Sequence, residues 1–228
     1  MTSVLIIGGG GMIGQKLASS FSTNDSLTLL DIGFPNKNQS NARKIIGSVG
    51  DPEIIENSLK DLPEVIYYLA SVVSGEAEAD FSKGWDVNIH AFWAFLSLVK
   101  KLNEKSQGQY KPKIIFTSSI AVFGSPFPNQ IPDDFIAAPR TSYGAQKASC
   151  ELMLNDFSRK GFCEGLAIRL PTICVRPGKP NLAASSFFSG IIREPLSGIN
   201  AQLPVSTAVR HWHASPRSAV RFLRHAET

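Results

Sequence analysis

Tyr143 and Lys147 stand four residues apart in segment 142–160, which has the pattern of a helix, so both side chains are expected on one helix face. A phenol is a poor base near neutral pH because its pKa is close to 10. A neighbouring ammonium group stabilises the phenolate form. The pair is therefore suited to taking a proton from an alcohol. The same spacing also occurs by chance in many helices, so other residues must support this interpretation.

Three hydroxyl residues, Thr117, Ser118 and Ser119, follow one another at the end of a predicted strand that begins at residue 114. A hydroxyl group at the carboxyl end of a parallel strand is well placed to hold a substrate oxygen. Ser119 is the predicted residue for this role, and Ser118 is its competitor. Simple turn chemistry is the alternative, because hydroxyl residues are common in turns.

A glycine cluster follows the first apolar run of the chain, residues 4–7, and reads Gly-Gly-Gly-Gly-Met-Ile-Gly. It satisfies both G-x-G-x-x-G and G-x-x-G-x-x-G. Such a cluster lets the chain turn sharply, lets the backbone approach a pyrophosphate, and aims the N–H groups of the next helix at the phosphates. A purely structural turn is the alternative. The predicted contacts to a dinucleotide are Gly8, Gly11, Met12, Ile13 and Gly14.

Asp31 ends the second predicted strand, residues 27–30. A carboxylate there can accept hydrogen bonds from the adenosine ribose and repels a 2′-phosphate, which favours NAD over NADP. An ordinary solvent-facing aspartate is the alternative. Asp51 follows the third predicted strand, residues 44–49, and precedes Pro52. It fits a helix cap, a contact to the adenine amine, or both.

Short apolar runs alternate with helix-like segments along the chain. The predicted strands are 4–7, 27–30, 44–49, 65–69, 114–117 and 166–170, and the predicted helices are 11–20, 52–59, 85–102 and 142–160. This alternation predicts an α/β fold, a Rossmann-type doubly wound parallel sheet. Proline and glycine become frequent after Arg176. We therefore expect an NAD-binding Rossmann domain over residues 1–176 and a partial substrate-binding segment over 177–228.

The composition narrows the class of protein. The 228 residues are 43% hydrophobic and 18% charged, with a formal net charge of +4, which suits one globular core. No apolar run is long enough to span a membrane, and the N-terminus does not read as a signal peptide. Three scattered cysteines predict neither a disulfide framework nor a zinc site. We expect a cytoplasmic protein without metal, membrane or nucleic-acid partners.

Taken in order, the glycine cluster, the acidic strand end, the run F-T-S-S-I-A-V-F-G at 116–124 and the Y-x-x-x-K pair resemble the extended short-chain dehydrogenases. This is the NAD-dependent epimerase/dehydratase family, and the resemblance covers residues 4 to about 178. It implies Ser119, Tyr143 and Lys147 as the catalytic residues, with Tyr143 and Lys147 also contacting NAD. The further residues that it implies beside the cofactor are Leu69, Ala70 and Pro171, with Asn88 in support.

A narrower resemblance, to the D-erythronate dehydrogenase subgroup, rests on residues 71–78, 171–181, 184–196 and 210–212. It implies that NAD oxidises a hydroxyl group of a small anionic sugar acid. Arginine is suited to a bidentate grip on a carboxylate, so the basic residues gain a role beyond a solvated surface. The predicted substrate contacts are Ser74, Ser119, Arg193 and Arg210, and Arg176 and Lys179 are further candidates to pair with the carboxylate.

Members of the family usually continue well beyond the length of this chain, so the resemblance implies a C-terminal truncation within a helix-like stretch at 216–226. Two other functions stay open. One is a nucleotide-sugar epimerase or dehydratase that recycles its NAD, and the other is an NAD-binding chain without turnover. By analogy with the family, the helices predicted at 85–102 and 142–160 form the contact of a homodimer.

Overall fold

A parallel sheet forms the centre of the molecule. The computed structural model describes residues 2–35, 42–178 and 182–228. The sheet contains six strands in the order β3-β2-β1-β4-β5-β6. In chain order they are β1 (Ser3–Ile7), β2 (Ser26–Asp31), β3 (Arg43–Ile46), β4 (Val65–Tyr68), β5 (Lys113–Ser119) and β6 (Glu164–Leu170). The strand order reverses between β1 and β4, which confirms the predicted doubly wound α/β fold.

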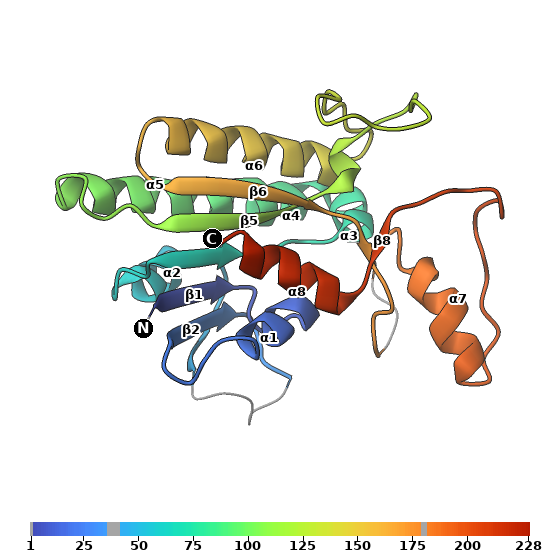
Figure 1. Ribbon diagram of the computed structural model, residues 1–228, viewed down its shortest axis with the longest axis horizontal. Helices are drawn as coiled ribbons and strands as arrows, with labels where there is room; N and C mark the ends of the chain where they lie inside the picture. Colours follow the sequence, from blue (N-terminus) through green and yellow to red (C-terminus); the bar gives the residue numbers. More distant parts are fainter. Residues whose placement is uncertain (1, 36–41, 179–181) are drawn as a thin grey trace.

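Helices cover both faces of this sheet (Figure 1). On one face lie α1 (Met12–Ala18) and α8 (Pro216–His225), and on the other lie α2 (Pro52–Leu59), α5 (Ala91–Lys105) and α6 (Ser142–Arg159). The short helices α3 (Ser74–Ala79) and α4 (Phe81–Trp85) lie between β4 and α5. A 3₁₀ turn, η2 (Ile120–Val122), follows β5 directly. The carboxyl ends of the strands therefore meet the turns that carry the candidate residues.

The strands read as continuous apolar runs because successive side chains enter two different cores. In β1, Leu5 and Ile7 belong to the core under α2, α5 and α6. Val4 and Ile6, which alternate with them, belong to the core under α1 and α8. A strand buried on both faces leaves no polar position, which explains why the sequence shows it as a short unbroken apolar run and not as an alternating pattern.

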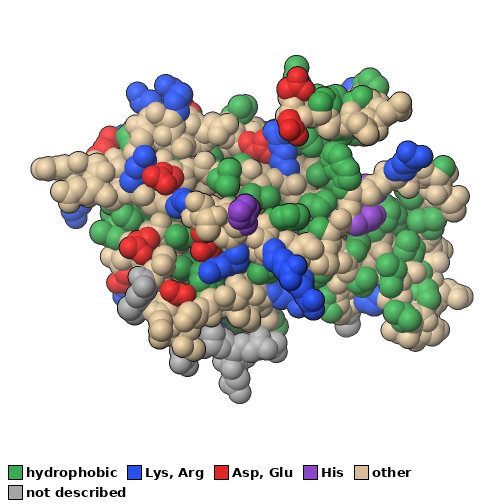
Figure 2. Space-filling model, viewed as in Figure 1, with side chains coloured by type: hydrophobic (Ala, Val, Ile, Leu, Met, Phe, Trp, Pro, Cys, Tyr) green, Lys and Arg blue, Asp and Glu red, His purple; other side chains and the backbone are tan. Residues whose placement is uncertain are grey.

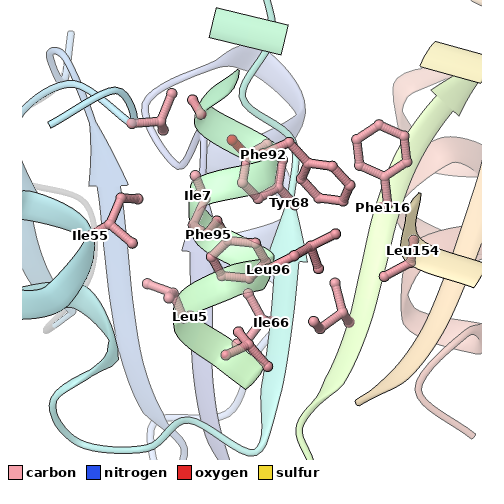
Figure 3. Close-up of a cluster of buried hydrophobic side chains, with 14 of the residues drawn as sticks. Leu5, Ile7, Ile55, Ile66, Tyr68, Phe92, Phe95, Leu96, Phe116 and Leu154 are labelled. Carbon is pink, nitrogen blue, oxygen red and sulfur yellow. The ribbon is translucent and has the colours of Figure 1, made fainter. Parts of the chain in front are cut away.

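Aromatic rings fill the core under α5 (Figure 3). Phe92 lies edge-on to Tyr68, with ring centres 4.8 Å apart, and it also contacts Phe116 at 4.7 Å. Phe95 contacts Tyr68 from the next turn of the helix at 5.2 Å. These contacts join α5 to β4 and β5, the two strands whose carboxyl ends carry candidate residues.

The helix predicted over 85–102 has different bounds in the structure. α4 ends at Trp85, residues Asp86–His90 form a π-helical turn η1, and α5 runs from Ala91 to Lys105. Apolar periodicity reports a buried face but not a change of helical pitch, so the sequence did not indicate this turn. A π-helical turn inserts an extra residue into the helix, and such turns are frequent at functional sites. Asn88 lies within it.

The chain beyond β6 forms a second, two-stranded sheet. β7 (Thr172–Ile173) pairs in parallel with β8 (His213–Ala214), and α7 (Phe187–Leu196) lies between them in sequence. α7 stands away from the main sheet (Figure 1). Apolar side chains gather on that part of the surface (Figure 2), and the exposed ones include Leu196, Ile199 and Trp212.

α8 returns from this region to the main sheet. Leu223 is fully buried in the core that contains Leu17 and Tyr67. The Tyr67 hydroxyl donates to the Leu223 carbonyl oxygen at 3.4 Å. By its packing α8 therefore belongs to the Rossmann core, although it lies inside the predicted segment 177–228. The domain boundary near residue 176 stays a prediction.

The helices, acidic groups and thiols of the described part bear on membrane and metal binding. None of its helices combines the length and apolar character that crossing a bilayer requires. Within the same ranges, no group of three or more His, Cys, Asp or Glu side chains could hold a metal ion. Cys150 and Cys163 are buried free thiols, and burial raises the pKa of Cys150 to about 12 and that of Cys163 to about 11.

Leu223 gives a test of the role of α8. We expect Leu223→Ala to lower the free energy of unfolding by about 2–5 kcal/mol, because a fully buried leucine leaves a cavity when it is truncated. Phe222→Ala, at a neighbouring position of the same helix that is 50% exposed, is the matched control and should cost much less. Urea unfolding measures both. Equal losses in the two variants would contradict the packing of α8 on the sheet.

Candidate active site

The glycine cluster forms the turn between β1 and α1, at the point where the strand order reverses. Gly8 has a φ of +90°, which favours glycine. A Cβ atom on Gly14 would lie 2.2 Å from the Gly8 carbonyl oxygen, and one on Gly10 would lie 2.1 Å from the Gly33 carbonyl oxygen. These three glycines are therefore required by the close approach of one backbone segment to another.

Gly11 differs from its neighbours. A Cβ atom there would meet only the Gly8 carbonyl oxygen, at 3.4 Å, and the residue is exposed. It occupies the N-cap position of α1, and among the described residues no side chain caps this helix. The N–H groups of the first turn, at Met12 and Ile13, have no acceptor within the helix. An open backbone before an uncapped helix start is a cradle that a Cβ would fill, and it fits the pyrophosphate of NAD.

Leu69 and Ala70 lie beside this turn. Both backbone N–H groups donate to the Ile7 carbonyl oxygen, at 2.8 and 3.1 Å. A Cβ atom on Gly8 would lie 2.7 Å from the Ala70 nitrogen. The fold therefore brings these two predicted cofactor residues next to the glycine cluster, although more than fifty positions separate them in sequence.

Asp31 reaches back to the glycine turn from the end of β2. Its Oδ2 atom accepts a hydrogen bond from the Gly10 N–H group at 2.8 Å. An ionised carboxylate has about four acceptor sites, so this one bond leaves capacity for ribose hydroxyls. Asp51 is the N-cap of α2 and accepts from the Glu53 N–H group at 3.0 Å. Asp51 thus makes the predicted cap, while its predicted contact with adenine stays a prediction.

Lys147 is the most constrained of the predicted catalytic residues. It is 2% exposed, and its Nζ atom donates to the Thr117 carbonyl oxygen at 2.8 Å. The same ammonium lies 4.6 Å from the centre of the Phe116 ring and 5.6 Å from that of Tyr143. Tyr143 itself is half-buried. The Tyr143–Lys147 pair therefore occupies one face of α6, as its spacing predicts, and is fastened to the end of β5.

The two candidate serines are placed differently. Ser119 is half-buried, and its Oγ atom accepts from the Ala121 N–H group at 3.1 Å. Ser118 is buried, and its hydroxyl donates to Glu151. A Cβ atom on Gly144 would lie 2.2 Å from the Ala121 carbonyl oxygen, so the first turn of α6 presses against η2. This places Tyr143 close to the turn that follows Ser119, and the difference in burial favours Ser119 as the ligand contact.

Asn88 connects the loop after β4 to α6. Its Oδ1 atom accepts from the Val72 N–H group at 2.8 Å and from the Ser71 hydroxyl at 3.0 Å. Its Nδ2 atom donates to Gln146 Oε1 at 2.7 Å. Asn88 and Gln146 are both buried, so these bonds are hard to replace with water. The sequence did not predict a role for Gln146, although this residue directly precedes Lys147.

The predicted substrate residues do not share one environment. The Ser74 Oγ atom accepts from the Ala184 N–H group at 2.9 Å, and Pro171 is half-buried between β6 and β7. Arg193 is held within the protein, because its Nη1 atom donates to the Arg176 carbonyl oxygen at 2.8 Å and its guanidinium pairs with Glu194. Arg210 is exposed in the segment before β8. Lys179 lies outside the described residues.

His211, near the second sheet, is not among the predicted site residues. The Nε2 atom of His211 lies 2.7 Å from the Thr172 hydroxyl, and its ring stacks on Phe188 with centres 4.6 Å apart. Desolvation, with a smaller effect of nearby His213, lowers the pKa of His211. Contacts between β7, β8 and α7 cannot be read from spacing, because the three elements are far apart in the chain. The run Arg210-His211-Trp212 therefore gave no prediction of these contacts.

Comparison with known proteins places the chain in a family. The NAD dependent epimerase/dehydratase family model matches residues 4–214. Two curated relatives, both called D-erythronate dehydrogenase, are similar. The protein from Cupriavidus necator is 43% identical, and the match covers 97% of this chain and 70% of that protein. The protein from Haemophilus influenzae is 41% identical, and the match covers 98% of this chain and 71% of that protein. The chain therefore belongs to the NAD dependent epimerase/dehydratase family.

A solved structure agrees with this assignment. A protein from Agrobacterium tumefaciens, described as a nucleoside-diphosphate-sugar epimerase, superimposes with a TM-score of 0.89. It is 48% identical to this chain, and the match covers 99% of this chain and 68% of that protein. The matched relatives thus carry two kinds of name, dehydrogenase and epimerase.

Substitutions at Gly11 and Gly14 should separate an effect on NADH binding from an effect on the stability of the fold. We expect Gly11→Ala to change the free energy of unfolding by no more than about 0.5 kcal/mol, because its Cβ has room. The same Cβ intrudes on the cradle, so the dissociation constant for NADH should rise at least about tenfold. Gly14→Ala should instead destabilise the fold by about 1–3 kcal/mol through its clash with Gly8. NADH fluorescence and urea unfolding measure the two effects, and unchanged NADH affinity in Gly11→Ala would rule out this cradle.

Proposed function

We propose that this chain oxidises a hydroxyl group of a small anionic sugar acid of the D-erythronate kind, with NAD. The observation that carries the proposal is the Lys147 ammonium. It bonds to the Thr117 carbonyl oxygen at 2.8 Å and faces the Tyr143 ring. It therefore holds the candidate base, Tyr143, beside the end of β5, where Ser119 carries its hydroxyl group.

Each residue of this set has a distinct task. Tyr143 takes the proton from the substrate hydroxyl, because its side chain shares a face of α6 with the Lys147 ammonium, which lies 5.6 Å from its ring centre. Ser119 holds the substrate oxygen through its half-buried hydroxyl. Lys147 orients Tyr143 and would contact the nicotinamide ribose. NAD, when bound, would accept the hydride from the carbon atom that carries the hydroxyl group.

The residues present fit NAD on the glycine side of the sheet. The open backbone at Gly11, with the uncapped N–H groups of Met12 and Ile13, would hold the pyrophosphate. Asp31 would accept from the adenosine ribose while it keeps its bond to Gly10. Leu69 and Ala70 would line the cofactor, and Pro171 would lie at the strand end beside its nicotinamide. These are the roles that the sequence predicts for them.

The names of two relatives support the choice of an acidic substrate. The two relatives at 43% and 41% identity are both called D-erythronate dehydrogenase. A carboxylate would be met by Arg210, the exposed guanidinium of the predicted substrate contacts. Arg193 already pairs with Glu194, so in this proposal it supports the local structure first.

A nucleotide-sugar epimerase is the second candidate, because the similar Agrobacterium tumefaciens protein is described as one. The two functions differ in the fate of the electrons. A dehydrogenase releases one NADH for each substrate oxidised, whereas an epimerase returns the hydride and shows no net NADH. An NAD-binding chain without turnover is the third candidate.

The apolar surface of α5 and α6 supports the proposed homodimer. Trp93 on α5 is 53% exposed and Leu152 on α6 is 72% exposed. Large exposed apolar side chains on neighbouring helices favour burial against a second copy.

The function is tested by adding D-erythronate and NAD and following NADH absorbance. We expect NADH to form, and Tyr143→Phe to lower kcat by about 10²- to 10⁴-fold, because the aromatic ring stays but the phenolic oxygen that accepts the proton is lost. NADH affinity should change little in this variant. No NADH, with a UDP-sugar converted to its epimer, would instead establish the second candidate. NADH binding without either reaction would establish the third.

Asp31 gives a test of the choice of cofactor. The parent chain should bind NADH more tightly than NADPH, because the carboxylate repels a 2′-phosphate. Asp31→Asn keeps an acceptor for the Gly10 N–H group and removes the charge. It should therefore reduce the ratio of the NADPH to the NADH dissociation constant by about tenfold. Fluorescence titration measures both constants, and an unchanged ratio would show that Asp31 does not select the cofactor.

A further inference from the structure

Glu151 lies deep beside the candidate site and has no part in the chemistry proposed above. It is 9% exposed, and its Oε1 atom accepts the Ser118 hydroxyl. Arg169 binds the same carboxylate through two nitrogens, from Nε to Oε1 at 3.0 Å and from Nη2 to Oε2 at 2.8 Å. A carboxylate at this depth is stable only with such partners, because an unpaired buried charge is costly.

The three residues of this cluster come from the three elements that carry the site. Ser118 directly precedes Ser119 on β5. Arg169 is its register partner on β6, two residues before Pro171. Glu151 is one helical turn beyond Lys147 on α6. The cluster therefore joins two neighbouring strands to the helix at the level of the candidate residues.

α6 is thus held to β5 at two successive positions. Lys147 bonds to Thr117, and Glu151, four residues further along the helix, bonds to Ser118. A helix fastened at one point can rotate or slide about it, but two directional bonds one turn apart prevent both motions. The bidentate guanidinium of Arg169 fixes the carboxylate plane as well as its position.

Arg169 also extends the cluster toward the second sheet. Its guanidinium lies 5.0 Å from the centre of the Phe123 ring, which follows η2. Phe123 in turn meets the edge of Trp212 at 6.2 Å, in the segment that carries Arg210 and leads into β8. The Arg169 side chain therefore contacts Phe123, after η2, on one side and the Glu151 carboxylate on the other.

We propose that Glu151 and Arg169 are positioning residues that set Tyr143 and Lys147 of α6 against Ser119 of β5. The proposal rests on the function proposed above for those three residues. In this role the pair needs no contact with substrate or cofactor. It acts by fixing the helix against the two strands, so its loss displaces the base from the substrate hydroxyl while the cofactor cradle at β1 is unaffected.

Three variants test this proposal. Glu151→Gln keeps the shape of the side chain and removes its charge. The double variant Glu151→Leu with Arg169→Met removes both charges, so that neither is left unpaired. Glu104→Gln is the matched control, because Glu104 pairs with Lys100 at 2.7 Å on the exposed surface of α5.

We expect Glu151→Gln to lower kcat by about 10- to 100-fold, with the NADH dissociation constant within about twofold of the parent value. The double variant should regain the unfolding midpoint of the parent chain in urea, yet kcat should stay low. Glu104→Gln should match the parent in all three measurements. If kcat in the double variant recovers together with the unfolding midpoint, the pair is only structural and the proposal is wrong.

A spectroscopic measurement keeps this test independent of turnover. The chain has four tyrosines, and Tyr67, Tyr68 and Tyr110 are buried, so Tyr143 alone is half-buried. In chain labelled with [¹³Cζ]tyrosine and free of NAD, Tyr143→Phe identifies the Tyr143 signal. We expect that signal to move in Glu151→Gln and in the double variant, and to stay in place in Glu104→Gln.

The two measurements separate the proposals. If the parent chain oxidises no sugar acid, the proposed function fails, and the Tyr143 signal still decides whether Glu151 positions α6. If the parent chain is active and the signal in Glu151→Gln coincides with that of the parent, the positioning role is overturned while the function stands.

Discussion

The buried bond between the Lys147 ammonium and the Thr117 carbonyl oxygen is the constraint on which the site depends. A charge that is 2% exposed is stable only where polar partners and ring faces replace water, and here Phe116 and Tyr143 supply the rings. Because the acceptor is the backbone at the end of β5, the bond fixes α6 relative to that strand. Tyr143, one turn earlier on the same face of α6, is then placed beside the turn after Ser119.

The cofactor side of the sheet depends on close backbone approach. Gly8, Gly10 and Gly14 admit no Cβ, because carbonyl or nitrogen atoms of neighbouring segments occupy the space. Gly11 has that space free, and it faces the uncapped start of α1. One cluster of glycines therefore serves two purposes. Three of them allow the turn to form, and one leaves it open toward an anionic ligand.

Charged residues show how far tertiary contacts decide the role of a side chain. Arg193 and Arg210 have the same chemistry in sequence, yet Arg193 is bound to Glu194 and to the Arg176 carbonyl oxygen while Arg210 is exposed. Arg169 has no predicted role in the site, but with Glu151 and Ser118 it joins β5, β6 and α6. The i, i+4, i+8 spacing of Tyr143, Lys147 and Glu151 was a usable signal, because it places all three on one face of α6.

The sequence by itself determined the sheet, the glycine turn, the acidic end of β2 and the Tyr143–Lys147 pair, because each depends on local geometry or on periodicity within one element. It did not determine the π-helical turn at Asn88, since apolar spacing carries no information on helical pitch. Nor did it reveal that α8 returns to cover β1 and β4, or that Glu151 holds Ser118 and Arg169. Those contacts join residues far apart in the chain, and only the folded sheet brings them within bonding distance.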